Sequence, residues 1–256
     1  SIMNELKSST SRTIFFGDDN FAVNKRETKN LLEKIIYEGL NDKDYYYQLD
    51  INSAFTSPRE NSIDEDFINL LKKSGGFSVF LGLESINEET LKQYGKFASV
   101  ERNKLAVKAF RDGGLWVHGM MIVGADSETS ETLEETLDWC KDNLDSVQFF
   151  APIPLPGTPF KKDMESQGRI LTKEYNLYDG FHVIIKPKNF SPYELQMKII
   201  DMHKDFYSFN GSWKRIIKSS HPVYKIGIHA YAKKITHDIL NDPQTKGHLD
   251  LLKKIN

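Results

Sequence analysis

Residues 116–150, WVHGMMIVGADSETSETLEETLDWCKDNLDSVQFF, carry the pattern that decides the fold. The apolar run Trp116–Val123 predicts a buried strand, Ser130–Asn143 has the apolar periodicity of a helix, and Ser146–Phe150 predicts a second strand. A strand, a helix and a strand within about 35 residues have the size of one unit in which a helix joins two parallel strands. We therefore expect a parallel sheet with helices packed outside it.

The same alternation continues towards the N-terminus. Apolar runs at Thr13–Gly17, Tyr45–Ile51 and Phe77–Leu83 predict three earlier strands, and Thr13–Gly17 (TIFFG) is interpreted as a buried one. Helices are expected around these strands at Ile2–Leu6, Asn24–Gly39, Asp64–Ser74, Glu88–Tyr94 and Val100–Arg111. A doubly wound open sheet would also fit, but neither Gly-rich phosphate fingerprint, GxGxxG or GxxxxGK[ST], follows a predicted strand. The pattern therefore favours an α/β fold of the full or partial barrel type.

Beyond Pro159 the alternation stops. One more strand is expected at Phe181–Lys186. Helices are expected at Pro159–Gly168, at Pro192–Phe209 with Ser191 as N-cap, and at Ser212–Ser219, Tyr224–Leu240 and Pro243–Lys254. The sequence thus predicts a barrel region over residues 1–168 and a mostly helical extension over residues 169–256. The leading helix has no strand before it, so it is either a cap over the barrel floor or the sequel to a missing first strand.

Composition excludes several classes of protein. The chain has 256 residues, 34 Lys or Arg, 36 Asp or Glu and a mean hydropathy of −0.49, and no apolar run approaches the roughly 20 residues of a membrane-spanning helix. There is no recognisable secretion signal, and the lone Cys140 forms no internal disulfide, so we expect a cytoplasmic protein. From Trp213 onward nine Lys or Arg stand against three Asp. We interpret this basic tail as a solvated helical face, with no nucleic-acid partner.

Polar residues follow the predicted strands, and in parallel barrels ligands bind at the carboxyl ends of the strands. The polar segments are Gly17-Asp18-Asp19-Asn20, Asp50-Ile51-Asn52, Gly82-Leu83-Glu84-Ser85 and Gly124-Ala125-Asp126-Ser127-Glu128. Each carboxylate taken singly could cap the helix that follows it. Several carboxylates at one rim repel one another unless they face a cation or hydrogen-bond donors. The functional hypothesis is therefore a metal or a ligand rich in donors.

Three further features each have a functional and a structural interpretation. Residues 152–159, PIPLPGTP, either offer their backbone groups to a planar ring or form a rigid corner. His118 is expected to be a satisfied core residue rather than a metal ligand or proton carrier. Cys140 is expected to be a buried apolar side chain rather than a nucleophile. No HxH, HExxH or GxSxG motif supports zinc or serine chemistry.

The order of these segments resembles the radical SAM superfamily, and in particular its branch with a cobalamin-binding domain. The matching segments are FFGDDNF (15–21), YQLDINSAF (47–55), FLGLESINEETLKQYGK (80–96), MIVGADSET (121–129), PIPLPGTPF (152–160), GRI (168–170), FHVIIKPKNFSPYELQ (181–196) and DFYSFNGSWKRI (205–216). Each motif is short, and the specificity comes from their order. The resemblance covers the chain up to about Ile217.

This resemblance implies a partial (β/α) barrel of the radical SAM type that binds S-adenosylmethionine beside a [4Fe-4S] cluster. In such enzymes an electron from the cluster produces a 5′-deoxyadenosyl radical, which takes hydrogen from a substrate. The substrate class is left open, and so is the choice between methyl transfer, rearrangement and oxidation. The resemblance further implies a reductant such as flavodoxin or ferredoxin as a partner, and it brings cobalamin into consideration as a second cofactor.

By position, the resemblance assigns contacts with S-adenosylmethionine to the strand ends. Contacts with the methionine part are expected from Gly17, Asp18, Asp19, Asp50 and Asn52, with Lys96 as a weaker candidate for its carboxylate. Contacts with the nucleoside are expected from Glu84 and Ser85 at the ribose, from Gly124 and Asp126 at the adenosine, and from Phe150 and Ala151 at the adenine. Carboxylates suit this ligand because it offers an ammonium group and ribose hydroxyls. Within the extension, Tyr178, His182 and Lys186 are the residues expected on the substrate side.

The chain departs from the family in its cysteines. The superfamily holds its cluster with a CxxxCxxC loop after the first strand, because three thiolates ligate three irons, whereas this sequence contains only Cys140. We expect that the cluster loop, a first strand and any cobalamin domain lie upstream of Ser1. Without that strand, Thr13–Gly17 would be an unpaired apolar sheet edge, so the chain expressed alone is expected to aggregate or to be partly molten.

Two other functions compete with this interpretation. A divalent-metal hydrolase could use the acidic rim, with ligands drawn from Asp18, Asp19, Glu84, Asp126 and His118. A non-catalytic binding module could instead recognise a partner through the basic C-terminal helices.

Overall fold

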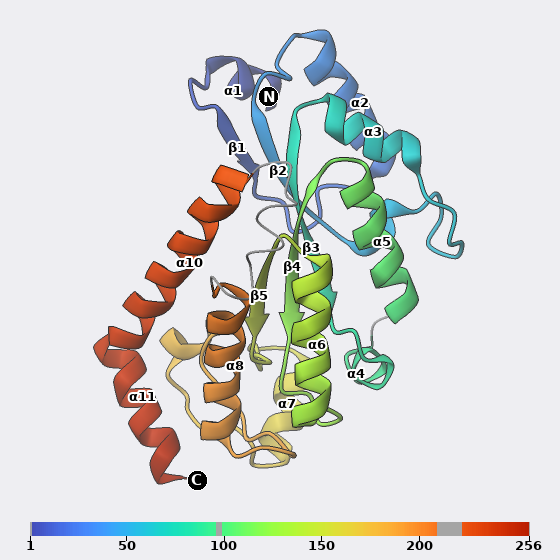
Figure 1. Cartoon of the computed structure of the whole chain (residues 1–256). Helices are drawn as coiled ribbons and strands as arrows, with labels where there is room; N and C mark the ends of the chain where they lie inside the picture. Colours follow the sequence, from blue (N-terminus) through green and yellow to red (C-terminus); the bar gives the residue numbers. More distant parts are fainter. Residues whose placement is uncertain (1, 96–98, 209–221, 256) are drawn as a thin grey trace. The chain divides into compact units, whose positions relative to one another are not determined.

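The computed structural model describes residues 2–95, 99–208 and 222–255 and contains a five-stranded sheet (Figure 1). Its strands are β1 (Thr13–Phe16), β2 (Asp44–Leu49), β3 (Gly76–Glu84), β4 (Trp116–Ile122) and β5 (Ser146–Phe150). They lie side by side in chain order, β1-β2-β3-β4-β5. A doubly wound sheet reverses its strand order at a switch point. The uniform order therefore confirms the partial barrel and argues against the doubly wound alternative.

Parallel pairing is explicit at the start of the sheet. Residue Thr13 of β1 pairs with Asp44 of β2, and Leu49 of β2 pairs with Leu81 of β3. Helices connect the strands, as parallel pairing requires. They are α2 (Lys25–Tyr37), α3 (Glu65–Lys73), α4 (Glu88–Gln93), α5 (Val100–Asp112) and α6 (Ser130–Asn143), with α1 (Ile2–Ser8) before β1 and a short 3-10 helix η1 (Ile51–Ala54) after β2. Several begin where a side chain accepts a backbone N–H, for example Asn24 before α2 and Asp64 before α3.

The chain divides into two compact units. The first comprises Ser1–Leu83, Phe97–Gly119 and Asn143–Ser146, and the second comprises Glu84–Lys96, Met120–Asp142 and Val147–Asn256. In the first unit the sheet residues Tyr45, Tyr47 and Leu49 are almost fully buried, as alternation along a strand with one packed face predicts. The boundary at residue 168 between barrel and extension stays a prediction.

In the second unit, helix α8 (Pro192–Phe206) covers the outer edge of β5. The Tyr207 hydroxyl accepts from the Val147 N–H at 2.9 Å and donates to the Val147 carbonyl at 2.7 Å. His203 Nε2 accepts from the Phe149 N–H at 3.2 Å, and burial lowers the pKa of His203, which keeps this nitrogen unprotonated. Side chains of a helix thus satisfy the edge that another strand would otherwise pair with.

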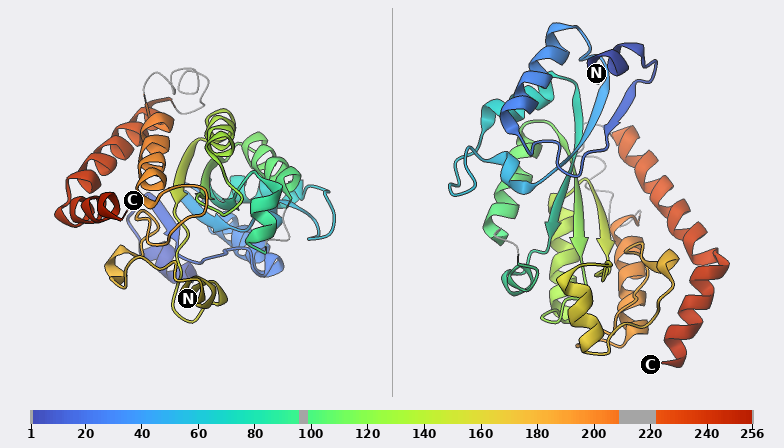
Figure 2. Two further views of the ribbon diagram at one scale, coloured as in Figure 1. Left: turned by 90° about the horizontal axis from the view of Figure 1, so that it is seen from below. Right: turned by 180° about the vertical axis from the view of Figure 1, so that it is seen from behind.

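Helices complete the second unit as the sequence predicts. Helix α7 (Pro159–Ser166) follows the proline-rich segment, and Ser191 and Glu194 form a capping box at the start of α8. Helices α10 (Pro222–Asn241) and α11 (Pro243–Lys254) pack against α8 (Figure 2, orange and red). The predicted helix Ser212–Ser219 lies outside the described residues. Among the described residues, no helix is both long and apolar enough to span a membrane.

Two predicted elements are wrong in part. Strand β1 was expected to be buried, but it is only partly so: Phe16 is 8% exposed and Phe15 is 53% exposed. The reason is that β1 is an edge strand, which pairs only with β2 in the described sheet. The predicted strand Phe181–Lys186 is reduced to a single bridge between Ile170 and Ile185. The reason is visible at Val183, whose N–H donates to the Gln196 side chain on α8 at 2.8 Å and so is unavailable for a ladder.

Candidate functional site

The ends of β1 and β2 meet in the first unit. Asn20 Oδ1 accepts from the Asp50 N–H at 3.4 Å and from the Ala22 N–H at 3.1 Å. Asp18 and Asp19 are exposed and cap no helix, since Asn24 is the N-cap of α2. The capping interpretation of these two carboxylates is therefore wrong, and Gly17 before them is exposed as well.

Asp50 and Asn52 form one polar unit at the start of η1. Asp50 Oδ1 accepts two hydrogen bonds from Asn52, one from its N–H at 2.8 Å and one from its side-chain amide at 2.6 Å. Neither hydrogen bond uses Asp50 Oδ2, for which no partner is found in the described part of the chain. Both side chains are half-buried. This strand end therefore presents a carboxylate oxygen that can accept from a ligand.

Arg102 on α5 holds the same segment from the other side. Its guanidinium donates to Asn52 Oδ1 at 3.1 Å, to the Glu60 carbonyl at 2.7 Å and to Asn61 Oδ1 at 2.8 Å. Its central carbon lies 3.8 Å from the centroid of the Phe55 ring, which is a cation–π contact. Arg102 is only 8% exposed. The sequence contained no signal for this role, because 50 residues separate Arg102 from Asn52.

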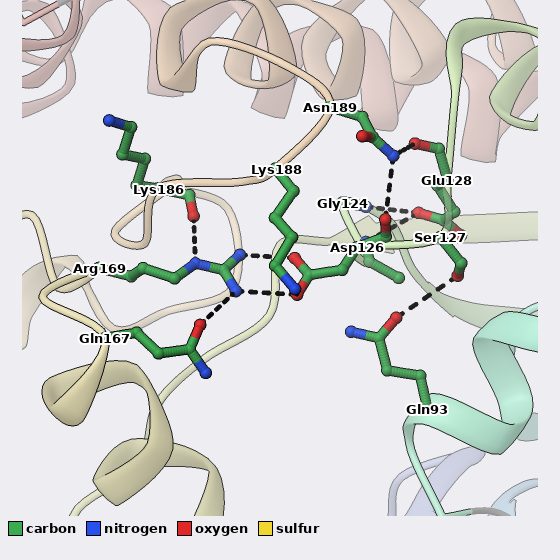
Figure 3. Close-up of polar contacts among 11 residues, drawn as sticks. Gln93, Gly124, Asp126, Ser127, Glu128, Gln167, Arg169, Lys186, Lys188 and Asn189 are labelled. Atoms are coloured by element: carbon green, nitrogen blue, oxygen red, sulfur yellow. Dashed lines mark hydrogen bonds and ion pairs between the residues drawn. The ribbon is translucent and has the colours of Figure 1, made fainter.

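The end of β4 in the second unit is closed by cations (Figure 3). Asp126 accepts a bidentate pair from Arg169, at 2.6 and 2.8 Å, and its Oδ2 also lies 2.9 Å from Lys188 Nζ. Burial opposes ionisation of Asp126, but the hydrogen bonds and charges of Arg169 and Lys188 outweigh it and lower the pKa of Asp126. The Arg169 Nε also donates to the Lys186 carbonyl at 2.7 Å. Both carboxylate oxygens are thus engaged within the protein, and the capping interpretation of Asp126 is wrong.

Glu128 fills the turn beside Asp126. Its Oε2 accepts from the Gly124 N–H at 2.6 Å and from the Ala125 N–H at 3.0 Å, and the side chain is buried at 1% exposure (Figure 3). Burial raises the pKa of Glu128 to about 7, although these two N–H groups and the Thr90 hydroxyl favour the charged form. Gly124 has a φ of +106°, and an added Cβ would lie 2.5 Å from the Leu195 side chain. Only glycine therefore fits this turn.

Glu84 ends β3 in a strained backbone conformation. Its φ of +59° is in the left-handed region, where it is the one residue other than glycine among the described part of the chain. Such strain is concentrated at functional sites. The next residue, Ser85, is fully buried, and its hydroxyl accepts from the Asn87 N–H at 3.0 Å. Asn87, not Glu84 or Ser85, caps α4.

The proline-rich segment begins at a closely packed corner. The Ala151 N–H donates to the Gly180 carbonyl, and an added Cβ on Gly180 would lie 2.6 Å from the Phe150 ring. The N–H groups of Leu155 and Thr158 donate to the carbonyls of Ile153 and Leu155. These amides have partners within the segment, so the structure favours the interpretation as a rigid corner. A small pocket beside it is lined by Tyr94, Asp126, Pro152, Phe160, Met164 and Arg169.

The remaining candidate residues from the sequence differ in their burial. His118 is buried, and its Nδ1 lies 2.8 Å from the Ser146 hydroxyl, as expected for a core residue. Cys140 is fully buried on α6, which confirms the predicted burial of this side chain. His182 is also buried, between Asp179 at 2.9 Å and the Thr245 hydroxyl at 3.1 Å. Lys186 is exposed, and Lys96 lies outside the described residues.

A metal site finds no support in the described residues, which contain no group of three or more His, Cys, Asp or Glu side chains able to hold an ion. A [4Fe-4S] cluster does not fit this chain either, because a single fully buried cysteine cannot supply three thiolates. Carboxylate acceptors for a donor-rich ligand are present in each unit. In the first unit, Asp50 Oδ2 has no hydrogen-bond partner among the described residues. In the second unit, Glu84 ends β3 with another carboxylate.

Similar proteins identify the family. Residues 1–140 match the radical SAM superfamily. The chain is 28% identical over 194 residues to the anaerobic magnesium-protoporphyrin IX monomethyl ester cyclase of Cereibacter sphaeroides, covering 74% of this chain and 30% of that protein. It is 25% identical over 203 residues to the bacteriochlorophyllide d C-8(2)-methyltransferase of Chlorobaculum tepidum, covering 78% of this chain and 42% of that one. The chain thus spans less than half the length of these relatives.

A solved structure agrees at the level of fold. The cobalamin-dependent S-adenosylmethionine radical enzyme OxsB, with aqua-cobalamin and S-adenosylmethionine bound, superimposes with a TM-score of 0.57 at 15% identity, over 99% of this chain and 45% of that one. The uniform strand order, the polar strand ends and the match over residues 1–140 lead to one conclusion: the chain belongs to the radical SAM superfamily.

Proposed function

We propose that this chain is the S-adenosylmethionine-binding portion of a radical SAM enzyme that acts on a small molecule, with methyl transfer as its class of reaction. The observation that carries the proposal is the family match over residues 1–140, which include strands β1 to β4 with their polar carboxyl ends. Methyl transfer is supported by the Chlorobaculum tepidum relative, which is a bacteriochlorophyllide d methyltransferase. When bound, S-adenosylmethionine supplies the sulfonium group whose cleavage or methyl donation defines this family's chemistry.

The residues that would bind the ligand are assigned unit by unit. In the first unit, Asp50 would accept from the ammonium group through its unengaged Oδ2, with Asn52 holding its other oxygen. Gly17, Asp18 and Asp19 are exposed and would lie near the same amino group. Lys96 stays a candidate for the methionine carboxylate.

In the second unit, Glu84 would accept from the ribose hydroxyls, beside the buried Ser85. Phe150 and Ala151 would line the adenine, as would the backbone of Gly124. Asp126 would support the adenosine indirectly, because both of its oxygens already accept from Arg169 and Lys188. Its role in the proposal is to hold the turn rather than to contact the ligand.

The other cofactors come from outside this sequence in the proposal. Since the 256 residues contain one cysteine, the thiolates for a [4Fe-4S] cluster would have to be supplied by other residues of the protein. Cobalamin joins the proposal because the OxsB structure contains it. A one-electron reductant such as flavodoxin or ferredoxin would then be a partner of the whole enzyme.

Isothermal titration of the whole enzyme that contains this chain with S-adenosylmethionine tests this proposal. Asp50→Asn and Glu84→Gln should each weaken binding about tenfold, because each removes a charged acceptor from a charge-assisted hydrogen bond. Glu134→Gln is the matched control, since Glu134 is exposed on α6 and has no part in the site. Unchanged affinity in both site variants, or no binding to the unaltered whole enzyme, would overturn the proposal.

A further inference from the structure

Arg102 is an unusual buried charge in the first unit. It is 8% exposed, and the described residues provide it with no carboxylate within ion-pair distance. Its acceptors are instead one backbone carbonyl and two side-chain amides, and its Nε is buried with no hydrogen-bond partner in the part of the chain that the structure describes. Burying a guanidinium without a direct ion pair costs free energy. A residue of this kind needs an explanation beyond packing.

The hydrogen bond from Arg102 to Asn52 provides such an explanation, because it determines the orientation of the Asn52 side-chain amide. A guanidinium only donates, so the amide atom 3.1 Å from Arg102 must be the oxygen. The amide nitrogen is then turned towards Asp50, where it donates to Oδ1 at 2.6 Å. Since the Asn52 N–H donates to the same oxygen at 2.8 Å, the Asp50 carboxylate is held in one orientation, in which Oδ2 has no hydrogen-bond partner among the described residues.

We propose that Arg102 is a positioning residue for Asp50, which it orients through the Asn52 amide so that Oδ2 receives the ammonium group of the ligand's amino-acid portion. The inference rests on the proposed function and deepens it. Arg102 is anchored independently of the ligand, through the Glu60 carbonyl, Asn61 and the face of the Phe55 ring. The orientation of Asp50 is therefore established before binding, which reduces the entropy lost when the ligand binds.

The sign of the change in affinity separates positioning from simple electrostatics. The positive charge of Arg102 opposes a cation at Asp50, so a purely electrostatic role predicts that Arg102→Met binds S-adenosylmethionine more tightly. A positioning role predicts binding about fivefold weaker, the effect of one misplaced hydrogen bond. Asn52→Leu should weaken binding by a similar factor although the charge is retained, and it keeps the Arg102 bonds to Glu60 and Asn61 if Arg102→Met fails to fold.

A double-mutant cycle by titration calorimetry completes the test. Because Arg102 acts through Asp50, Arg102→Met should have no further effect on affinity in the Asp50→Asn background, whereas a merely structural role gives the same loss in both backgrounds. Binding of 5′-methylthioadenosine, which lacks the amino-acid portion, should be unchanged in every variant. Arg111→Met is the matched control, since Arg111 lies on the same helix but donates to the Asn143 carbonyl.

The outcomes separate the two proposals. If Asp50→Asn weakens binding and neither Arg102→Met nor Asn52→Leu does, or if Arg102→Met binds more tightly, the positioning role of Arg102 is overturned and the proposed function stands. If Asp50→Asn leaves the affinity unchanged, the role of Asp50 falls and the positioning role falls with it, while Glu84→Gln still tests the proposed function.

Discussion

Two strand ends of this protein are each followed by a polar segment with an aspartate, but the two aspartates have opposite local environments. After β2, Asp50 is held by Asn52 through one oxygen, and Arg102 contacts Asn52 rather than the carboxylate. After β4, Asp126 is bound directly by Arg169 and Lys188 through both oxygens. An aspartate after a strand is therefore open to a ligand in the first unit and closed by the protein in the second. The difference between the two aspartates depends on whether the guanidinium of an arginine distant in the sequence donates to the carboxylate itself or to a neighbouring side chain.

The largest effect is expected from opening the closed site. Arg169→Met should lower the free energy of unfolding by about 3 kcal/mol, because it leaves the Asp126 carboxylate without its bidentate partner in a poorly solvated position. Urea unfolding followed by circular dichroism measures this loss. Lys188→Met, which removes a cation that is 59% exposed, should cost under about 1 kcal/mol. Equal losses in the two variants would contradict the view that Arg169 closes the site.

The turn before Asp126 should make the second unit sensitive to pH. Because burial raises the pKa of Glu128 from 4.5 to about 7, the folded state binds more protons than the unfolded state between these values. Protonated Glu128 therefore contributes its full stabilisation below about pH 4.5, and this contribution is lost as the pH rises to about 7. The total change in the free energy of unfolding is about 3 kcal/mol. Glu128→Gln should remove this part of the pH dependence, as measured by urea unfolding at pH 5 and pH 8. An identical pH profile in the variant would show that Glu128 does not titrate in this range.

The smallest changes in the free energy of unfolding are expected when each of the two aspartates is replaced by asparagine. Asp126→Asn should cost about 2 kcal/mol, because Arg169 then lies buried opposite a neutral amide. Asp50→Asn should cost under about 0.5 kcal/mol, because an amide oxygen can still accept from Asn52 and Oδ2 has no partner to lose among the described residues. Thermal unfolding of the two variants side by side provides the measurement. If Asp50→Asn proves the more destabilising of the two, the open and closed assignments are reversed.

Local patterns predicted most of the fold. All five strands of the sheet were expected within about two residues, and so were the helices before and between them, since apolar periodicity and N-cap residues such as Asn24 and Asp64 act over a few positions. The predictions that were wrong concerned features that depend on tertiary contacts. The burial of β1 depended on whether it has one neighbouring strand or two, and the strand expected at 181–186 was prevented by Gln196, whose side chain accepts from Val183.

The candidate site was predicted only as a list of positions. Two arginines decide whether each aspartate is open or engaged. Arg102 lies on α5 and follows its partner Asn52 by 50 residues, and Arg169 lies in a loop and follows its partner Asp126 by 43 residues. Arg102 belongs to none of the segments that carry the family resemblance, and Arg169 stands in one of them, GRI (168–170), which indicates nothing about its partner Asp126. Glu128 belongs to the polar segment after β4, but its burial and its hydrogen bonds from the Gly124 and Ala125 N–H groups depend on the shape of the turn.

The sequence by itself determined the order of the elements and the family, because apolar periodicity, capping residues and short ordered motifs are properties of neighbouring residues. The tertiary structure alone decided which polar groups face one another. A hydrogen bond or ion pair depends on fractions of an ångström and on the exclusion of water, and these are set only when segments far apart in the chain pack together. Asp50 and Asp126 are both aspartates in polar segments that follow a strand, and they acquire different polar partners only when α5 and the loop carrying Arg169 reach those segments.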